Sequence, residues 1–481
     1  MNPKENIKYL LKKTPLYNIL RLKRDQIVNY FEKRRRVSGH NQYTVVSAVY
    51  NVDKYLEEYF ESIVNQTLKF EDHIHLIMVD DGSPDSSAKI IKKWQEKYPN
   101  NITYLKKENG GQASARNLGI EHVKTEWVTF IDSDDFLHYQ YFENVDQFLE
   151  KNNAMKVEFI SCNIVYFHEK DNKIKNNHPL RYKYSNEDKI VTPEKMEGFI
   201  QLSASISFFK KTILKQKNIV FPEHIKPNFE DAYFVNQYFI ENPYLNIGIL
   251  KKPIYFYRKR SDTTSTIDNS WKSIDKYTNV LEYGYLNILK FSYNKLGKVP
   301  LYIQRTVLSD LIWHLRYLIN HSYKVNHLSF EHKSNYLELI KEIFCYIDKD
   351  TIENFDLINI TYMHKVGILG RFKNSYPTIQ QCNIDFYDEE KQEIEIHFFY
   401  YLPIEEDFFI DSHVVKPRIF KTQQYDFVHE IFVYEKIIKL PLSNTGKELK
   451  IKFNDKDVHI ILKGRIYNNG LSLQEVKNVK F

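Results

Sequence analysis

The chain has 481 residues, more than one ordinary hydrophobic core accommodates, so two to four domains are expected. Its 42% hydrophobic and 27% charged content excludes a disordered chain, and the absence of an apolar run of about 18 residues predicts no membrane span. Cys162, Cys345 and Cys382 are odd in number and widely spaced, which excludes a disulfide framework and a zinc site. Because no secretory signal is recognised either, these features predict a cytoplasmic protein.

The net charge of +6 is concentrated at the start of the chain, where residues 1–40 hold eleven Lys or Arg against three acids. A basic amphipathic segment of this kind predicts peripheral contact with an anionic membrane at the cytosolic face. An alternative is a solvated helix that packs on the following domain. No nucleic-acid partner is expected, because no recognition motif accompanies the charge.

From Tyr43 onward the sequence alternates between short buried strands and helices. The β-branched run Tyr43–Val49 predicts a buried parallel strand, and apolar spacing over 53–67 predicts a helix. Further strands and helices are expected at His75–Val79, 86–98, Ile102–Leu105, Ala113–His122 and Trp127–Ile131. This alternation predicts a parallel sheet wrapped by helices, with ligands at the carboxyl ends of the strands.

The remainder of the chain changes its period twice. Residues from about 270 to 355 show helical spacing, whereas alternation beyond about 375, as in Ile394–Phe398, predicts an antiparallel β-sandwich. Asn454–Asp457 supplies turn residues between two strand-like runs. The predicted domains are a basic helical extension (1–40), an α/β domain (41–268), a helical linker domain (269–360) and a β-sandwich accessory domain (361–481).

Two motifs follow the first two predicted strands. Ala48-Val49-Tyr50-Asn51 closes the first strand, where the ring of Tyr50 either flanks a base or packs on the sheet edge. Val79–Asp85 follows the second strand, where a carboxylate can accept hydrogen bonds from a nucleobase or ribose. A turn with a helix N-cap is the alternative, and both hold if Asp85 or Ser86 caps while Asp81 binds.

The third motif is Asn109–Asn117. Gly110 and Gly111 permit close approach of the backbone to a ligand, and Arg116 lies about one turn into the following helix. A helix start favours anions, and the guanidinium fork suits phosphate. The motif is not a P-loop, because the Gly-Lys-Ser/Thr ending is missing.

The fourth motif, Phe130–Asp135, ends an apolar strand with three carboxylates, those of Asp132, Asp134 and Asp135. Three carboxylates this close repel one another unless a cation lies among them. Oxygen ligands suit Mg²⁺ or Mn²⁺ bridging a diphosphate. A capped turn is the alternative interpretation.

The fifth motif is distant in the sequence. Glu230 and Asp231 form an acidic pair that could supply a general base. Further on, Arg258 and Arg260, with Ser265 beyond them, could hold a leaving diphosphate. Taken singly, each group is ordinary surface composition.

The order and spacing of the five motifs resemble family 2 glycosyltransferases with a GT-A fold, over about residues 44–265. The matching segments read AVYN, VDDGSPD, NGGQASARN, IDSDDF and FEDAYF. The resemblance implies a GT-A (Rossmann-like) nucleotide-sugar-binding domain of the α/β class. Two departures are Ala48, where the family usually has Pro, and the basic segment YRKRSDTTS, which is denser than usual.

The resemblance also implies roles for individual residues. Asp231 is implied as the catalytic base with Glu230 beside it, and Asp134 as the ligand of Mn²⁺ or Mg²⁺. Contacts to the nucleotide-sugar are implied for Ala48, Tyr50, Asp81, Asn109, Arg116, Asp132, Ser133, Arg258, Arg260 and Ser265.

The resemblance thus implies an inverting, metal-dependent hexosyl- or N-acetylhexosaminyltransferase. Its donor is a nucleotide-sugar, with UDP favoured, and its acceptor is a hydroxyl of a polysaccharide, teichoic-acid-like or lipid-linked glycan in bacterial cell-wall or capsule synthesis. The layout also suggests a homo-oligomer through the C-terminal domains. Two rivals are transfer of glycerol- or ribitol-phosphate and a non-catalytic carbohydrate-binding scaffold, although Asp132, Asp134 and Asp231 argue against the scaffold.

Overall fold

The computed structural model describes residues 36–196, 199–261, 270–442 and 446–479. The chain divides into two compact units, Met1–Ile303 (unit 1) and Gln304–Phe481 (unit 2). Their boundary lies inside the predicted helical segment 269–360, and the predicted boundaries at 268 and 360 stay predictions. Residues 1–35 of the basic extension and Ser265 lie outside the described residues.

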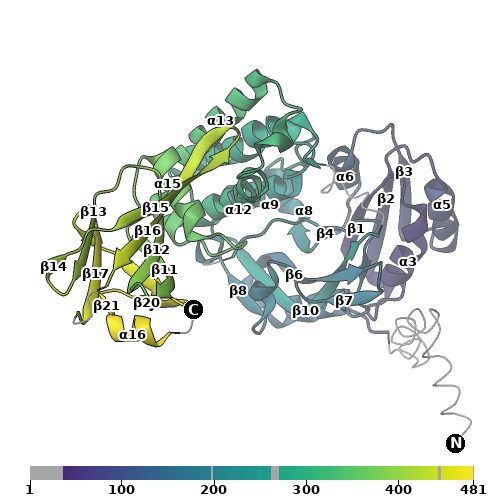
Figure 1. Ribbon diagram of the computed structural model, residues 1–481. Helices are drawn as coiled ribbons and strands as arrows, with labels where there is room; N and C mark the ends of the chain where they lie inside the picture. Colours follow the sequence, from purple (N-terminus) through teal and green to yellow (C-terminus); the bar gives the residue numbers. More distant parts are fainter. Residues whose placement is uncertain (1–35, 197–198, 262–269, 443–445, 480–481) are drawn as a thin grey trace, which may run out of the picture. The chain divides into compact units, whose positions relative to one another are not determined.

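Unit 1 is built on one large sheet (Figure 1). Its described part has ten strands, with the order β3-β2-β1-β4-β9-β6-β10-β5, while β7 pairs with β6 and β8 with β10. The first four strands are mutually parallel, and β1 pairs with β2 on one side and β4 on the other. Burial on both faces explains why β1 reads as a continuous apolar run. These four strands are β1 (Tyr43–Val49), β2 (Ile74–Asp80), β3 (Ile102–Lys106) and β4 (Trp127–Phe130).

The second half of the sheet is mixed. Strand β9 runs antiparallel to both β4 and β6, and β10 runs parallel to β6 along most of its length. The strands are β5 (Phe136–Leu137), β6 (Val157–His168), β7 (Lys173–Lys175), β8 (Lys189–Val191), β9 (Ser207–Lys210) and β10 (Asn246–Lys259).

Helices connect the parallel strands, as the alternation predicts. The six apolar residues of α3 that share one helical face, from Tyr55 to Val64, are all buried. Helix α6 packs very closely on β1, because a Cβ added at Gly119 would overlap the Val46 side chain. The helices are α3 (Asp53–Val64), α4 (Phe70–His73), α5 (Ser87–Lys97), α6 (Gln112–Glu121), α7 (Tyr141–Lys151), α8 (Lys211–Gln216) and α9 (Glu230–Glu241).

The segment predicted as helical is helical, and it continues to Lys373. A π-helical stretch, Val280–Leu286, and α11 (Asn287–Leu296) belong to unit 1, and the boundary between the units falls within α12 (Leu301–Leu318). Unit 2 continues with α13 (Phe330–Cys345), α14 (Lys349–Glu353) and α15 (Tyr362–Lys373). None of the described helices is both long and apolar enough to cross a bilayer.

The rest of unit 2 consists of two sheets. Among the described residues, one has the order β15-β16-β12-β11-β19-β20 and the other β14-β13-β17-β18, with β21 on β17. Side chains of both sheets share one core, for example Ile396 with Ile451, as a sandwich requires. The strands are β11 (Gln381–Asp388), β12 (Glu393–Tyr400), β13 (Glu406–Ile410), β14 (His413–Val414), β15 (Arg418–Phe427), β16 (Glu430–Pro441), β17 (Glu448–Phe453), β18 (Lys456–Asp457), β19 (His459–Leu462), β20 (Arg465–Tyr467) and β21 (Leu471–Ser472); α16 (Leu473–Asn478) follows.

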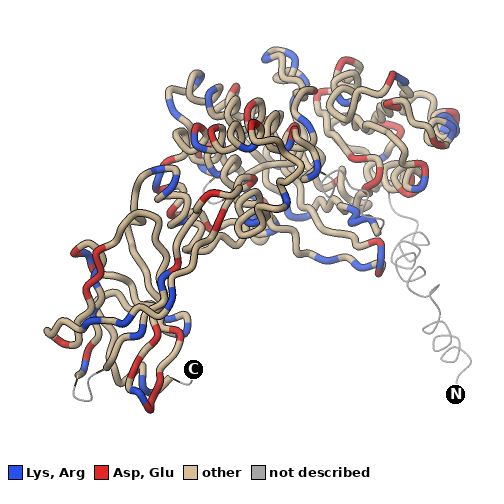
Figure 2. The backbone as a smooth tube through the Cα atoms, turned by 45° about the horizontal axis from the view of Figure 1, so that its top comes forward, with Lys and Arg blue, Asp and Glu red and all other residues tan. Residues whose placement is uncertain are grey.

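Two details refine the predicted sandwich. The turn between β17 and β18 is confirmed, and Asn454 and Asp455 both have positive φ, as a two-residue hairpin turn requires. The sandwich is not wholly antiparallel, because β11 pairs in parallel with β19. Figure 2 shows acidic and basic positions interspersed along both units, in keeping with 57 Lys or Arg against 59 Asp or Glu in residues 41–481.

Candidate active site

The motifs of the first half of unit 1 collect at the carboxyl edge of its parallel strands. Asn51, Asp81 and the glycine loop (Asn109–Gly111) follow β1, β2 and β3, and the acidic loop (Asp132–Asp135) follows β4. Parallel neighbours in register end at the same edge, which is where ligands bind on sheets of this type. The strand order therefore brings these four motifs to one edge of the sheet.

Asp81 holds the glycine loop in place. Its carboxylate, 3% exposed, accepts hydrogen bonds from the backbone N–H of Gly110 at 3.0 Å and Gly111 at 2.7 Å, and from Lys107 Nζ at 2.8 Å. Gly111 has a φ of +96°, a conformation that glycine adopts without strain. The sequence predicts a nucleobase contact for Asp81, and that contact would have to share these oxygens with the loop.

The end of β1 is tied to the acidic loop. Ser133 Oγ donates a hydrogen bond to the carbonyl oxygen of Ala48 at 2.8 Å, so these two residues join neighbouring strand ends. Tyr50, half exposed, and Asn109, exposed, lie at the same edge. Their predicted contacts with the nucleotide stay predictions.

Arg116 joins the two halves of the site. Its guanidinium, 2% exposed, donates through Nη2 to Asp132 Oδ1 at 2.7 Å and through Nη1 to Asp231 Oδ1. It also lies 5.0 Å from the ring centre of Phe221. The sequence predicts a nucleotide contact for Arg116, whereas the structure places its guanidinium between two carboxylates that are 16 and 115 positions away.

Each of these carboxylates has further partners. Asp132 accepts from Gln112 Nε2 at 2.8 Å and from Ser205 Oγ at 2.9 Å. Asp231 Oδ2 accepts from the backbone N–H of Ala204 at 3.0 Å. The Ser203–Ser205 segment, named the serine loop below, therefore contacts both carboxylates. Motif reasoning missed it because no sequence signature marks it, whereas Gln112 stands inside the quoted NGGQASARN segment.

The two arginines of the distal basic segment have different surroundings. Arg258, 5% exposed, donates through Nε to the carbonyl oxygen of Asp134 at 2.7 Å and through Nη2 to Glu58. Arg260, 20% exposed, donates through Nε and Nη2 to Asp134 Oδ2 at 2.9 and 2.5 Å. Arg258 is thus committed to the fold, whereas Arg260 contacts the partly exposed carboxylate of Asp134 in the acidic loop.

The acidic loop concentrates negative charge. Burial raises the pKa of Asp134, and repulsion from Asp132 adds to the rise against the attraction of Arg260. Burial, followed by repulsion from both neighbouring aspartates, raises the pKa of Asp135 well above its usual range. Asp135 accepts hydrogen bonds from Tyr255 Oη at 2.6 Å and from the backbone N–H of Arg258 at 2.7 Å, which assigns it to the fold.

The acidic loop fits a divalent cation that takes few protein ligands. The described residues hold no cluster of three or more His, Cys, Asp or Glu side chains arranged as a metal site. Asp134 nevertheless offers a partly exposed carboxylate, and a cation would relieve its repulsion from Asp132. Hard cations with oxygen ligands commonly complete their shell with water and phosphate. The assignment of Asp134 as a metal ligand stays a prediction.

The distal acidic pair opens α9. Burial raises the pKa of Glu230 to about 8, and the neighbouring charge of Asp231 contributes to the rise. Burial also raises the pKa of Asp231, against the opposing attraction of Arg116. Raised carboxylate pKa values beside a cation are typical of groups that exchange protons in enzymes.

Residues 44–208 match the model of the family described as glycosyl transferase family 2. The chain carries a family 2 glycosyltransferase domain. The match ends before the acidic pair and the two distal arginines, but all of these lie in the same compact unit as the family 2 domain.

Known proteins resemble the family 2 domain and the segments after it. The chain is 34% identical over 327 residues to the minor teichoic acid biosynthesis protein GgaB of Bacillus subtilis, which is 68% of this chain and 35% of that protein. It is 29% identical over 284 residues to GgaA of the same organism, 59% of this chain and 60% of that protein. The chain therefore spans between about a third and three fifths of these relatives.

A solved structure shares the fold. The crystal structure of Staphylococcus aureus TarS residues 1–349 in complex with UDP-GlcNAc aligns with a TM-score of 0.51 and 19% identity, over 65% of this chain and 83% of that chain. The alignment confirms the predicted GT-A fold of the family 2 domain.

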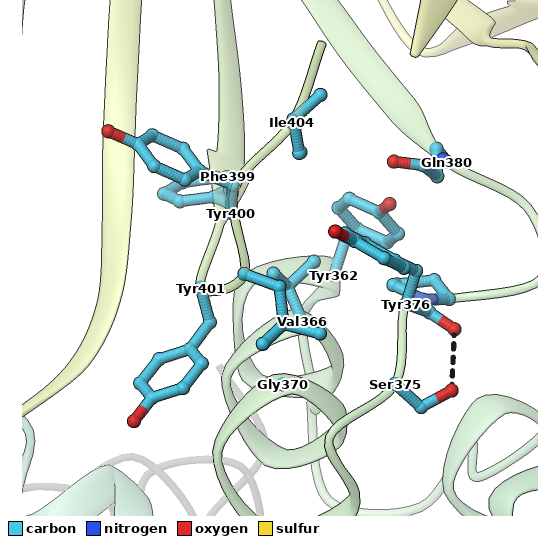
Figure 3. A pocket seen from close by; sticks show the side chains of 12 residues that line it. Tyr362, Val366, Gly370, Ser375, Tyr376, Gln380, Phe399, Tyr400, Tyr401 and Ile404 are labelled. Atoms are coloured by element: carbon cyan, nitrogen blue, oxygen red, sulfur yellow. Dashed lines mark hydrogen bonds between the residues drawn. The ribbon is translucent and has the colours of Figure 1, made fainter. Parts of the chain in front are cut away.

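Outside the family 2 domain, unit 2 contains a small hollow lined by aromatic rings (Figure 3). Its side chains come from α15, from the segment after it and from the end of β12, and they include Tyr362, Tyr376, Phe399 and Tyr400. The hollow measures about 10 Å³, room for one water molecule. A hollow of this size has no room for a sugar ring.

Proposed function

We propose that this chain is a glycosyltransferase that moves a hexosyl or N-acetylhexosaminyl group from a UDP-sugar to a hydroxyl of a teichoic-acid or related cell-wall polymer. The single observation that carries the proposal is the contact of Arg116 with Asp132 and Asp231. Through this contact a single guanidinium bonds both the acidic loop, proposed to face the donor, and the acidic pair, proposed to face the acceptor.

Asp231 is proposed as the catalytic base. Its Oδ atoms are held by Arg116 and by the N–H of Ala204, so the carboxylate is oriented before substrate binds. It would accept the proton of the acceptor hydroxyl while that oxygen attacks the anomeric carbon on the face opposite the diphosphate. One displacement of this kind inverts the configuration at that carbon. A base in position contributes about 10²–10⁴-fold to the rate.

The leaving diphosphate gains negative charge as the bond to the sugar breaks. Arg260 is the proposed partner for this charge, because its side chain is partly exposed at the acidic loop while that of Arg258 is buried. A divalent cation held by Asp134 would supply further neutralisation of the diphosphate. Tyr50 is proposed to flank the base of the nucleotide, since its ring is half exposed at the end of β1.

The substrate class rests on the relatives. GgaB and GgaA are named for minor teichoic acid biosynthesis, and the TarS structure contains UDP-GlcNAc. These names support a UDP-sugar as donor and a teichoic-acid-like polymer as acceptor. Peripheral membrane contact through residues 1–40 and a homo-oligomer through the C-terminal domains stay predictions.

A donor and acceptor screen tests the proposal. The full chain is incubated with Mn²⁺ and a panel of UDP-, GDP-, CDP- and dTDP-sugars, with and without a teichoic-acid polymer, and nucleoside diphosphate release is measured. We expect release from a UDP-hexose or UDP-N-acetylhexosamine that rises with the polymer, and a β linkage from an α-linked donor by NMR. Release from none of the donors would contradict the proposal, and a retained α linkage would contradict inversion.

A further inference from the structure

The serine loop, Ser203–Ser205, contacts both functional carboxylates on the side away from Arg116. Arg116 binds Oδ1 of Asp132 and Oδ1 of Asp231. The serine loop binds the other oxygen of each, through Ser205 Oγ to Asp132 Oδ2 at 2.9 Å and through the N–H of Ala204 to Asp231 Oδ2 at 3.0 Å. Two anchors on different oxygens restrict rotation of a carboxylate, which a single anchor does not.

The serine loop is itself tied down from within. Ser203 Oγ accepts a hydrogen bond from the N–H of Ser205 at 3.2 Å, and Ser207 Oγ donates to the carbonyl oxygen of Ser203 at 2.8 Å. The N–H of Ser207 donates to the carbonyl oxygen of Ala204 at 3.1 Å, so the loop continues into β9 without a gap. The loop is therefore positioned by the sheet.

Gln201 fixes the loop from the buried side. Its side chain, in a residue 3% exposed, donates through Nε2 to the carbonyl oxygen of Ser203 at 2.9 Å and to Ser207 Oγ at 3.0 Å. Its Oε1 accepts from Ser161 Oγ at 2.8 Å and from Lys183 Nζ. Two donated and two accepted hydrogen bonds use the full capacity of a glutamine amide.

The backbone of the serine loop determines which way this amide points. Because a carbonyl oxygen can only accept, the Gln201 atom that faces the carbonyl oxygen of Ser203 must be the nitrogen. The amide oxygen then faces Lys183, which is 3% exposed and also donates to the carbonyl oxygen of Ile200 at 3.3 Å. Burial lowers the pKa of Lys183 to about 7.

We propose that Ser205 and Gln201 are positioning residues, which hold Asp132 and Asp231 through the serine loop in the geometry needed for sugar transfer. This inference rests on the proposed function. A residue that acts in this way alters the rate of the chemical step more than substrate binding, because a displacement of about 1 Å can cost about a hundredfold in rate.

Ser205→Ala is the direct test, and the variant is assayed with the same donor and polymer as the wild-type protein. We expect kcat to fall between about tenfold and a hundredfold while KM for the donor changes less than about threefold. Ser205→Thr keeps the hydroxyl and should recover most of the loss. Ser292→Ala is the matched control, since Ser292 is fully buried in α11 and its hydroxyl donates to the carbonyl oxygen of Leu289 at 3.0 Å; its kcat should equal that of the wild type.

Gln201→Met tests the second anchor without touching the site. Its kcat loss should resemble that of Ser205→Ala, and the double variant should lose less than the product of the single losses, because both act through one loop. Wild-type kcat in Ser205→Ala, or multiplicative losses in the double variant, would overturn the proposal.

Hydrogen exchange at the Ala204 amide gives a readout that needs no turnover. The N–H bonded to Asp231 should be protected in the wild type and should exchange faster in Gln201→Met, and equal protection would overturn the proposal. A wild type that consumes no donor but shows this difference would refute the proposed function alone. An active wild type with neither effect would refute the positioning role alone.

Discussion

The carboxyl edge of the parallel strands in unit 1 and the small aromatic-lined hollow of unit 2 both contain polar groups, but in different surroundings. At the edge, Arg116 is 2% exposed and lies between two carboxylates, and burial raises the pKa of Asp231. In the hollow, the hydroxyls of Tyr362 and Tyr376 donate to backbone carbonyl oxygens of Ile379 and Pro403, at 3.4 and 2.5 Å. Burying charge costs free energy, whereas burying rings stabilises the fold. The costly arrangement is therefore the one expected to have a function.

The largest expected effect is on Asp231. Asp231→Asn should reduce kcat by about 10²–10⁴-fold, because the amide cannot accept the proton of the acceptor hydroxyl. Binding of UDP should change little, as measured by calorimetry. A variant with normal turnover would remove Asp231 from the base role and would weaken the contrast between the two regions.

Removal of divalent cations comes next. EDTA should lower the rate of transfer by about a hundredfold or more, since a metal supplies several kcal/mol of charge stabilisation. Adding Mn²⁺ or Mg²⁺ in excess should restore the rate, followed as nucleoside diphosphate release. A rate indifferent to EDTA would contradict the assignment of Asp134 as a metal ligand.

Of the two arginines near the acidic loop, one should affect activity when it is substituted and the other should affect stability. Arg260→Met should lower kcat/KM for the donor by about tenfold with an unchanged melting temperature, since Arg260 is partly exposed. Arg258→Met should instead cost about 2 kcal/mol of stability, because it leaves Glu58 and the Asp134 carbonyl without their donor. Kinetics and thermal melts on both variants measure this, and the reverse pattern would exchange their roles.

The pH dependence of kcat/KM should report the ionisation of the acidic pair, Glu230 and Asp231. Because the base must be ionised, kcat/KM should fall as the pH drops through the raised pKa of Asp231, at a higher pH than an exposed aspartate would give. Glu230 takes up its charge as the pH rises through about 8. Glu230→Gln should therefore remove an ionisation near pH 8 and keep the acidic limb, and an unchanged profile would contradict the assignment.

The smallest effect is expected in unit 2. Tyr376→Phe removes the hydroxyl that donates to the carbonyl oxygen of Pro403, and it should cost about 1 kcal/mol of unfolding free energy. Transfer to a soluble acceptor should keep the wild-type kcat. A loss of activity at unchanged stability would place the hollow in the reaction and would break the comparison.

Much of unit 1 is predictable because its signals are local. Each strand from β1 to β4 is a short apolar run, and each motif stands directly after one, so parallel pairing alone brings Asp81 and Asp132 to one edge. The apolar face of α3 follows from helical spacing in the same way.

The contacts across long sequence separations are not predictable in this way. The sequence predicts that Arg116 binds phosphate at a helix start. Its contact with Asp231, 115 positions away, is seen only in the folded chain. Ser205 belongs to no motif, because its role depends on where β9 inserts between β4 and β6. The parallel pairing of β11 with β19 is hidden for a similar reason, since alternation of side chains does not encode strand direction.

The close packing of α6 on β1 limits how far Arg116 can move. A methyl group at Gly119 would overlap the Val46 side chain, so the helix that carries Arg116 lies too close to β1 for a side chain at this position. Because packed protein interiors resist compression, α6 cannot move closer to β1. The position of the Arg116 guanidinium is therefore set by the centre of the sheet, and changes in surface loops should leave its contacts with Asp132 and Asp231 in place.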